Sequence, residues 1–117
     1  MSADEAIQDL LNFSTDTRSV AVLDAAGTVV AAAPAAVYAR LAAAATGLWG
    51  AAEACAAGSS KSALDYVVIQ DPEYGVAMLK EGERCIVALT GPKPAVGLLL
   101  FDLRTCLSDA YPQEAAR

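Results

Sequence analysis

The sequence contains no histidine, and this absence removes several kinds of chemistry at once. Histidine is the usual general base near neutral pH, the commonest metal ligand and the partner of catalytic serine and cysteine. Carboxylates would have to replace it, but the close pairs Asp71–Glu73 and Glu81–Glu83 lie at predicted turns, where solvated acids are ordinary. We therefore expect no catalytic residues and a protein that is not an enzyme.

Motifs that bind metals or phosphates are also missing. The cysteines Cys55, Cys85 and Cys106 are far apart, whereas zinc sites use CxxC pairs, and the acidic turns lack the alternating ligands of a calcium loop. Each cysteine lies in apolar sequence, which predicts small buried side chains in a reducing cytoplasm. The segment Gly91–Pro94 faintly resembles an anion site at a helix start, although a plain connector is the favoured interpretation. We expect no metal and no cofactor.

Basic residues are few, and long hydrophobic runs are absent. Eight basic residues against fourteen acidic ones give a net charge of −6, which argues against nucleic acid or an anionic membrane as a partner. The longest apolar stretches are broken by Arg40, Thr46, Glu53 and Asp102, well short of the about 20 apolar residues that span a bilayer. The N-terminal residues 1–5 lack the basic start of a signal peptide. We expect a cytoplasmic protein.

What the sequence does contain is a clear succession of short elements. Ser2 and Glu5 have the spacing of a capping box, which opens a short helix. The segment Asp24–Gly27 predicts a tight hairpin, because aspartate can bond the turn backbone and glycine can take a positive φ. The predicted elements are a helix from residue 3, strands at 19–23 and 28–32, a helix at 34–57, strands at 63–70, 76–79 and 85–90, and a helix from about 94–96 to 111.

This order predicts an α+β fold in one domain that spans residues 1–117. Five antiparallel strands with helices on their faces form such a sandwich. A chain of 117 residues buries roughly two-thirds of the surface of its unfolded form, so it needs neither disulfides nor metals to fold. Residues 113–117 are expected to form a frayed tail.

The predicted helix from Pro34 to Ala57 is dominated by alanine and glycine. Pro34 suits the first position of a helix, and only Arg40 and Glu53 are charged. A helix this poor in polar residues should be covered on more than one side. Its apolar face, at three- and four-residue spacing, is predicted to comprise Val37, Tyr38, Leu41, Ala44, Ala45, Leu48, Trp49, Ala52 and Cys55.

Two glycines and two large side chains make this helix a candidate contact surface. A glycine inside a helix costs about 1 kcal/mol relative to alanine, so Gly47 and Gly50 suggest close contact with another backbone. Leu48 and Trp49 could anchor a partner. The alternative is that Trp49 simply fills the core above the sheet.

The strand around Tyr66–Ile69 is apolar on both alternating faces, uncharged and free of proline. Such a strand promotes aggregation when it is exposed at the edge of a sheet. It is therefore predicted to be a central strand, or an edge strand that pairs with another chain.

Over nearly its whole length the sequence resembles the Roadblock/dynein light chain family, in particular its stand-alone bacterial and archaeal members. The resemblance rests on the hairpin Val20–Val30, the small-residue helix Leu41–Ala57, the meander Tyr66–Leu89 and the helix that begins near Val96. These are patterns of hydrophobicity and turns rather than invariant signatures.

The resemblance implies a profilin/longin-like sandwich, with one long helix on one face of a five-stranded antiparallel sheet and two shorter helices on the other. It implies that the third strand lies at an edge and pairs with its copy in a homodimer, beside two packed long helices. It also implies a small Ras-like GTPase, or a signalling or motor complex, as partner. The implied interface comprises Arg40, Leu41, Ala44, Leu48, Trp49, Ala52, Leu64, Tyr66, Val67, Val68 and Ile69.

Two other classes of function are weighed against this one. A small-molecule sensor of the PAS or GAF type also packs helices around an antiparallel sheet, but it needs a pocket with convergent polar groups. An enzyme is disfavoured because histidine is absent. Family members that stimulate GTP hydrolysis can act by repositioning the residues of the GTPase, and Arg40 is more readily a solvated arginine than an arginine finger.

Overall fold

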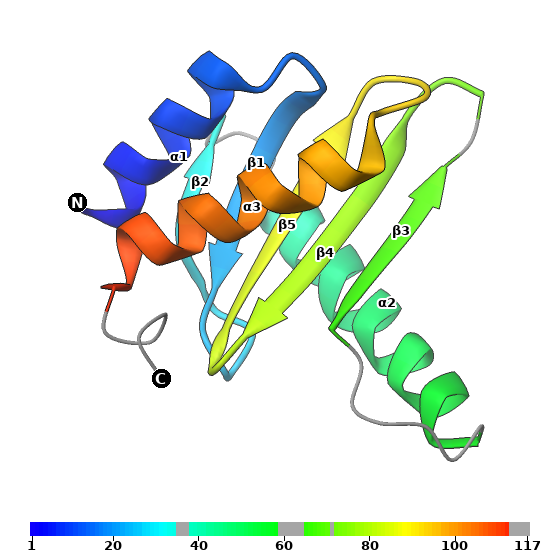
Figure 1. Ribbon diagram of the computed structural model, residues 1–117. Helices are drawn as coiled ribbons and strands as arrows, with labels where there is room; N and C mark the ends of the chain where they lie inside the picture. The colour runs from blue at the N-terminus through cyan, green and yellow to red at the C-terminus, as the bar shows by residue number, and fades with distance from the viewer. Residues whose placement is uncertain (35–37, 59–64, 71, 113–117) are drawn as a thin grey trace.

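The computed structural model describes residues 1–34, 38–58, 65–70 and 72–112, without the side chains of residues 38–43 and 57–58. These residues form three helices and five strands (Figure 1). The elements are α1 (Ala3–Phe13), β1 (Thr17–Leu23), β2 (Val29–Ala33), α2 (Tyr38–Gly58), β3 (Tyr66–Gln70), β4 (Gly75–Glu81), β5 (Arg84–Thr90) and α3 (Val96–Ala110). The predicted order of elements is confirmed. The predicted tail, residues 113–117, lies outside the described residues.

The strands form one antiparallel sheet in the order β2-β1-β5-β4-β3. β1 lies next to both β2 and β5, and the meander β3-β4-β5 continues the sheet to the other side. β2 and β3 are therefore the two edge strands. The third strand lies at an edge, as the family resemblance implies.

The three helices cover the two faces of the sheet unequally (Figure 1). α1 packs against α3 and against β1 and β2, while α3 packs against β4 and β5. α2 crosses the opposite face, where it packs against β1, β2 and β5. The predicted arrangement, with one long helix on one face and two shorter helices on the other, is confirmed. We call these the α2 face and the α1–α3 face.

Strand register assigns alternate side chains to the two faces, because successive side chains in a strand point to opposite sides. Val68 lies opposite Ala77, and Ala77 opposite Ala88, in a row that faces α1 and α3. One residue along, Val67 lies opposite Met78, in a row that faces α2. β3 therefore carries one valine on each face.

The larger core lies on the α1–α3 face. Ile7 of α1 and Leu99 and Leu103 of α3 are each no more than 1% exposed, and they pack on Leu79 and Ile86 of the sheet. On the α2 face the buried cluster is smaller, and its members are Ala21, Leu23, Ala45, Trp49, Met78 and Val87.

Local hydrogen bonds explain why the first elements form where they do. Glu5 N donates to Ser2 Oγ at 3.2 Å, and Ser2 N donates to Glu5 Oε1 at 3.2 Å, which is the predicted capping box. A hydrogen bond from the Ser2 side chain, followed by the bond from the Ser2 backbone N, lowers the pKa of Glu5, because both favour the charged carboxylate. In the β1–β2 turn, Asp24 Oδ1 accepts from Ala26 N at 2.9 Å and from Thr28 N at 3.0 Å. Gly27 adopts the predicted positive φ, at 83°.

The predicted start of the long helix is wrong. α2 begins at Tyr38 rather than at Pro34, and it ends at Gly58. Ala33 is still paired with Val20 in the sheet, so the chain must leave the extended conformation before it can enter the helix. Pro34 lies at a bend directly after the strand. Among the described residues, no helix combines the length and the hydrophobicity needed to cross a bilayer.

Candidate functional site

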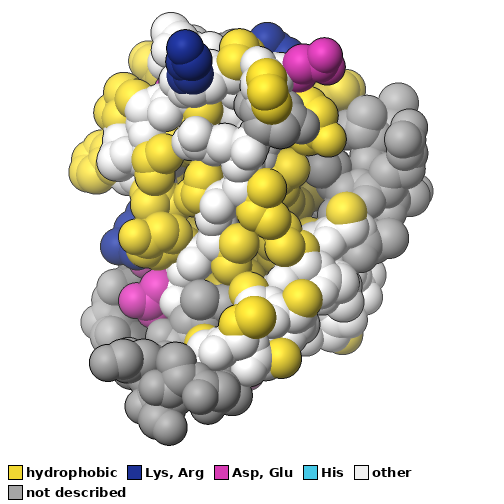
Figure 2. Space-filling model, turned by 90° about the vertical axis from the view of Figure 1, so that its right-hand side faces the viewer, with side chains coloured by type: hydrophobic (Ala, Val, Ile, Leu, Met, Phe, Trp, Pro, Cys, Tyr) yellow, Lys and Arg dark blue, Asp and Glu magenta, His cyan; other side chains and the backbone are white. Residues whose placement is uncertain are grey.

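The edge strand β3 is the first part of the candidate site. It pairs with β4 from Tyr66 opposite Leu79 to Gln70 opposite Gly75, and no other described strand lies on its outer side. Tyr66 is 45% exposed and Ile69 is 49% exposed, both high for large apolar side chains. Figure 2 looks onto this side of the molecule and shows hydrophobic side chains gathered over its centre, with charged side chains towards the margins.

The two edge strands differ in how they are protected. β2 packs against α1 on one face and α2 on the other, whereas the principal contacts of β3 are with β4 alone. An open apolar edge offers unpaired backbone N–H and C=O groups to any strand that approaches it. The sequence left open whether residues 66–69 are central or at an edge, and the structure places them at the open edge.

The apolar surface of the β3 edge continues inward on the α2 face, because the described residues cover that part of the sheet incompletely. Val76 lies opposite Ile69 and is half-buried, as is Val67 on the same face. The principal contacts of α2 are with the other half of the sheet, that is β1, β2 and β5, although Trp49 also reaches Met78 of β4. Ile69, Val67 and Val76 thus form an apolar strip beside the helix.

The outward side of α2 carries very small side chains. The members of this side, all exposed, are Ala44, Gly47, Gly50, Ala51, Ala54 and Cys55. A Cβ built on Gly47 or Gly50 would meet nothing within 4 Å. The close backbone contact that these glycines suggest is therefore not made within the described part of the chain.

Trp49 belongs to the core rather than to the exposed surface. It is only 8% exposed and packs with Ala21, Met78 and Val87 on the sheet. This position agrees with the alternative in which Trp49 fills the space above the sheet, and its role as an anchor for a partner stays a prediction. Its ring lines a hollow of about 310 Å³ between α2 and the ends of the hairpins, where Lys80 Nζ lies 5.8 Å from the ring centre.

The remaining predicted interface residues divide into three groups. Leu48 and Ala52 are half-buried on α2, while Ala44 is exposed on its outward side, which corrects its predicted place on the covered face. Val68 is half-buried against the core of the α1–α3 face. The side chains of Arg40 and Leu41, and the whole of Leu64, lie outside the described residues.

The cysteines do not share one environment, although all three were predicted to be buried. Cys106 is buried, Cys85 is half-buried and Cys55 is exposed. Cys55 lies near the C-terminal end of α2, where the helix runs on past the edge of the sheet (Figure 1), so none of the described strands covers it. Burial raises the pKa of the Cys85 thiol to about 11. Burial, followed by the negative charges of Asp109 and Asp9, raises the pKa of the Cys106 thiol to about 12.

The connector before α3 binds an anion from its own chain. Ala95 N, at the start of the helix, donates to Asp16 Oδ2 at 3.0 Å, and Gly91 N donates to the backbone oxygen of Asp16 at 3.1 Å. Asp16 thus occupies the place that an external anion would take at a helix N-terminus. Pro94 precedes the helix and is not its first residue. In the described ranges, no group of three or more acidic or thiol side chains is arranged to hold a metal ion.

Sequence reasoning missed one surface, the outer side of the α1–α3 face. Phe13 is 82% exposed at the end of α1, and Phe101 is 66% exposed on α3. Phe13 is the last residue of α1, and the polar residues that surround it in the sequence do not indicate an interaction surface. Phe101 lies off the stripe that the buried Leu99 and Leu103 form at helical spacing, and this offset is a sequence signal that could have identified it.

Comparison with solved structures identifies the fold. The chain aligns with a Roadblock/LC7 domain from Streptomyces avermitilis at a TM-score of 0.84 and 17% identity, over 97% of this chain and 98% of that one. It aligns with Myxococcus xanthus MglB at a TM-score of 0.80 and 14% identity, over 97% and 95% of the two chains. The gliding protein MglB from Thermus thermophilus aligns at a TM-score of 0.75 and 19% identity, over 92% and 85%.

These likenesses are structural, at low sequence identity. No protein-family model matches the sequence, and a search of curated proteins finds no match. The chain therefore has the fold of the Roadblock/LC7 domains, and the resemblance identified from the sequence is confirmed at the level of the fold. The alternative of a PAS or GAF sensor is not supported.

Proposed function

We propose that this protein is a non-enzymatic, homodimeric regulator or adaptor that binds a small Ras-like GTPase in the cytoplasm. The observation that carries the dimer is the open edge of β3, which is apolar on both faces and lacks a neighbouring strand within the described chain. The fold shared with Roadblock/LC7 domains, two of them MglB proteins, supports the GTPase as partner.

A second copy of the chain would cover both the open edge of β3 and the small-residue side of α2. Pairing β3 with its copy about a two-fold axis would satisfy the outer backbone groups of both strands and continue the sheet across the two chains. The same rotation would bring the small-residue sides of the two α2 helices together. Their backbones could approach closely, because Gly47 and Gly50 have open space around them.

The paired α2 helices are the proposed docking surface for the GTPase. In such a dimer they would form one continuous face on the side of the sheet opposite α1 and α3. As the family resemblance implies, the protein would act by positioning residues of its partner. Leu48 and Ala52, at the margin of this face, are the described side chains proposed to take part.

Ile69→Lys tests the dimer at its exposed edge. Light scattering should give the unmodified protein a mass near twice 12.0 kDa, and the variant a mass near 12.0 kDa, because each copy would bring a charge into a desolvated interface. The matched control is Val30→Lys on β2, the other edge strand, where the side chain is 46% exposed. This control should remain a dimer. A monomeric wild-type protein, or a dimeric Ile69→Lys variant, would refute the β3 interface.

Affinity capture tests the GTPase. The immobilised protein, incubated with extracts that contain a non-hydrolysable GTP analogue or GDP, should retain a Ras-like GTPase that mass spectrometry identifies, and retention should differ between the two nucleotides. Retention should fall with Ile69→Lys and persist with Val30→Lys. Turnover of a substrate by the isolated protein, with no GTPase retained, would overturn the proposal.

A further inference from the structure

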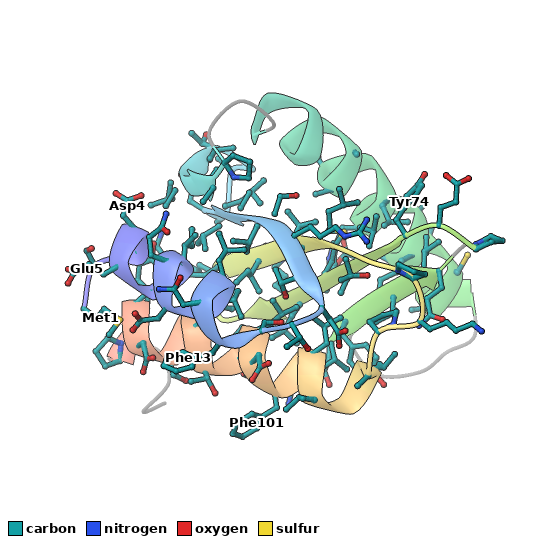
Figure 3. The ribbon with its side chains drawn as sticks, turned by 90° about the horizontal axis from the view of Figure 1, so that it is seen from above. Met1, Asp4, Glu5, Phe13, Tyr74 and Phe101 are labelled. Atoms are coloured by element: carbon teal, nitrogen blue, oxygen red, sulfur yellow. The ribbon has the colours of Figure 1, made fainter. Side chains whose placement is uncertain are left out.

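The outer surface of the α1–α3 face exposes large apolar side chains that the proposed dimer does not use. Phe13 is 82% exposed, Phe101 is 66% exposed and Leu98 is 58% exposed. In Figure 3, Phe13 and Phe101 lie on the outer side of the two helices, turned away from the sheet. Exposed aromatic side chains grouped on one surface are characteristic of protein interaction sites.

A shallow groove runs between α1 and α3 beside these side chains. Its volume is about 130 Å³, and the residues that matter to its chemistry are Asp9, Leu10, Phe13, Asp102, Cys106 and Asp109. Leu10 and Cys106 are buried and provide an apolar floor. Thr105 also lines the groove, and Phe101 lies one helical turn before it on the same side of α3. The apolar ridge of α3 therefore leads directly into the groove.

The rim of the groove is acidic and uncompensated. Asp9 lies on α1, which contains no lysine or arginine, and Asp102 and Asp109 lie on α3. None of the three carboxylates has an ion-pair partner among the residues that the structure describes. Arg104, the basic residue of α3, has its Nε 3.9 Å from Glu81 Oε1 instead. After burial, the negative charges of Asp109 and Asp9 also raise the pKa of the Cys106 thiol, which lines the groove.

The negative charge of the groove rim favours some classes of binding partner over others. A second copy bound symmetrically would bring two acidic rims together, which is unfavourable. Nucleic acids and anionic membranes are repelled for the same reason. The complementary occupant presents apolar side chains between positive charges, and a groove between two packed helices accepts an amphipathic helix.

We propose that the groove between α1 and α3 binds a basic amphipathic helix of a partner protein. Phe13 and Phe101 pack against the apolar side of that helix, and Asp9, Asp102 and Asp109 pair with the lysines or arginines that flank it. The site lies on the opposite side of the sheet from the α2 face. It therefore does not depend on the proposed dimer or on the GTPase, and it would let the protein hold two partners at once.

The probe is a synthetic helical peptide of about 18 residues, or five turns, built from leucine on one side and lysine on the other. Fluorescence anisotropy measures its binding, and amide chemical shifts locate it. We expect saturable binding that weakens with salt, with shifts confined to α1 and α3. A peptide with glutamate in place of lysine should not bind. Binding should be unchanged in the Ile69→Lys variant, which separates this site from the β3 interface.

Matched substitutions distinguish the groove from general attraction to an acidic protein. Phe101→Ala should weaken binding by about tenfold or more, as for an aromatic anchor, whereas Val30→Ala, at an exposed apolar residue of β2, should not. Asp102→Lys should weaken binding by about tenfold, while Glu83→Lys in the β4–β5 turn makes the same change in net charge and should alter it less than about twofold.

Three results of the binding experiments would overturn the proposal, and one further result concerns the oligomeric state. They are equal losses in Asp102→Lys and Glu83→Lys, binding of the glutamate peptide, and chemical shifts located on β3 and α2. Self-association through α1 and α3, seen as a mass above that of a dimer that Phe101→Ala abolishes, would assign the surface to a further copy of the chain and would also overturn it.

Discussion

The two faces of the sheet differ in how completely the chain covers them. On the α1–α3 face, two helices contribute Ile7, Leu10, Leu99, Leu103 and further residues to a buried core. On the α2 face, the described part of a longer helix contributes only Ala45 and Trp49 as buried residues. A helix of small side chains displaces little water from the sheet, so its contribution to stability is limited by what it buries. The face with less core is the face on which we propose that the two copies of the homodimer meet.

The largest expected effect comes from core residues on the two faces. Leu103→Ala should lower the free energy of unfolding by about 3 kcal/mol, because Leu103 is 0% exposed and the surrounding core cannot close the cavity. Leu48→Ala, at a half-buried position on α2, should cost about 1 kcal/mol. Urea denaturation at one low protein concentration measures both. Equal losses would show that the two faces contribute similarly to stability.

The reactivity of the cysteine thiols should also differ between the two faces of the sheet. At pH 8, Cys55 on the outward side of α2 should react first with a chromogenic disulfide reagent. Cys106, with a pKa of about 12 against an ordinary 9.0, holds roughly a thousandth of the usual thiolate fraction and should react only through unfolding. Mass spectrometry of the labelled protein identifies the sites. Prompt labelling of Cys106 would mean that the α1–α3 face opens readily.

Alanine at the α2 glycines should have opposite effects on folding and on assembly. In the Ile69→Lys background, Gly47→Ala or Gly50→Ala should each stabilise the chain by about 0.5–1 kcal/mol, because the added Cβ meets open space and the helix is favoured. In the otherwise unmodified protein, each should weaken the dimer measured by analytical ultracentrifugation. A dimer unaffected by both substitutions would place the partner helix elsewhere.

The smallest effect concerns pH and the capping box of α1. The pKa of Glu5 is lowered from 4.5 in the folded chain, so its contribution to stability is present above pH 4.5 and is lost as pH falls through the lower folded value. Glu5→Gln should therefore flatten the acid side of the stability curve while leaving stability near pH 7 only slightly reduced. Thermal melts of both proteins between pH 3 and pH 7 measure this, and identical curves would show that the cap contributes nothing.

Sequence reasoning succeeded where local chemistry determines structure. Asp24 and Gly27 define their turn through hydrogen bonds and backbone conformation within a few residues, and the Ser2–Glu5 box does the same for α1. The apolar stripe of α3 was predictable because Leu99, Leu103 and Leu107 recur at helical spacing and are all buried.

It failed where the outcome depends on which elements meet. An alanine-rich helix has nearly the same side-chain chemistry all round, so periodicity did not tell that Ala45 is buried while Ala44 is exposed. The start of α2 depends on how far β2 extends along β1, up to Ala33. The sequence likewise did not reveal that α2 leaves the β3 side of its face uncovered, because this follows from the angle at which the helix crosses the sheet.

The open edge of β3 also bears on how a cell that makes several such proteins keeps their pairings distinct. Backbone N–H and C=O groups are common to every polypeptide. The open edge of β3 can therefore pair with a strand of almost any sequence. Discrimination must come from the few side chains that flank the join, here Tyr66 and Ile69, which are exposed and differ in size and polarity. Small changes at these two residues could therefore redirect the chain from the proposed self-pairing to mixed pairing while its interior stays the same.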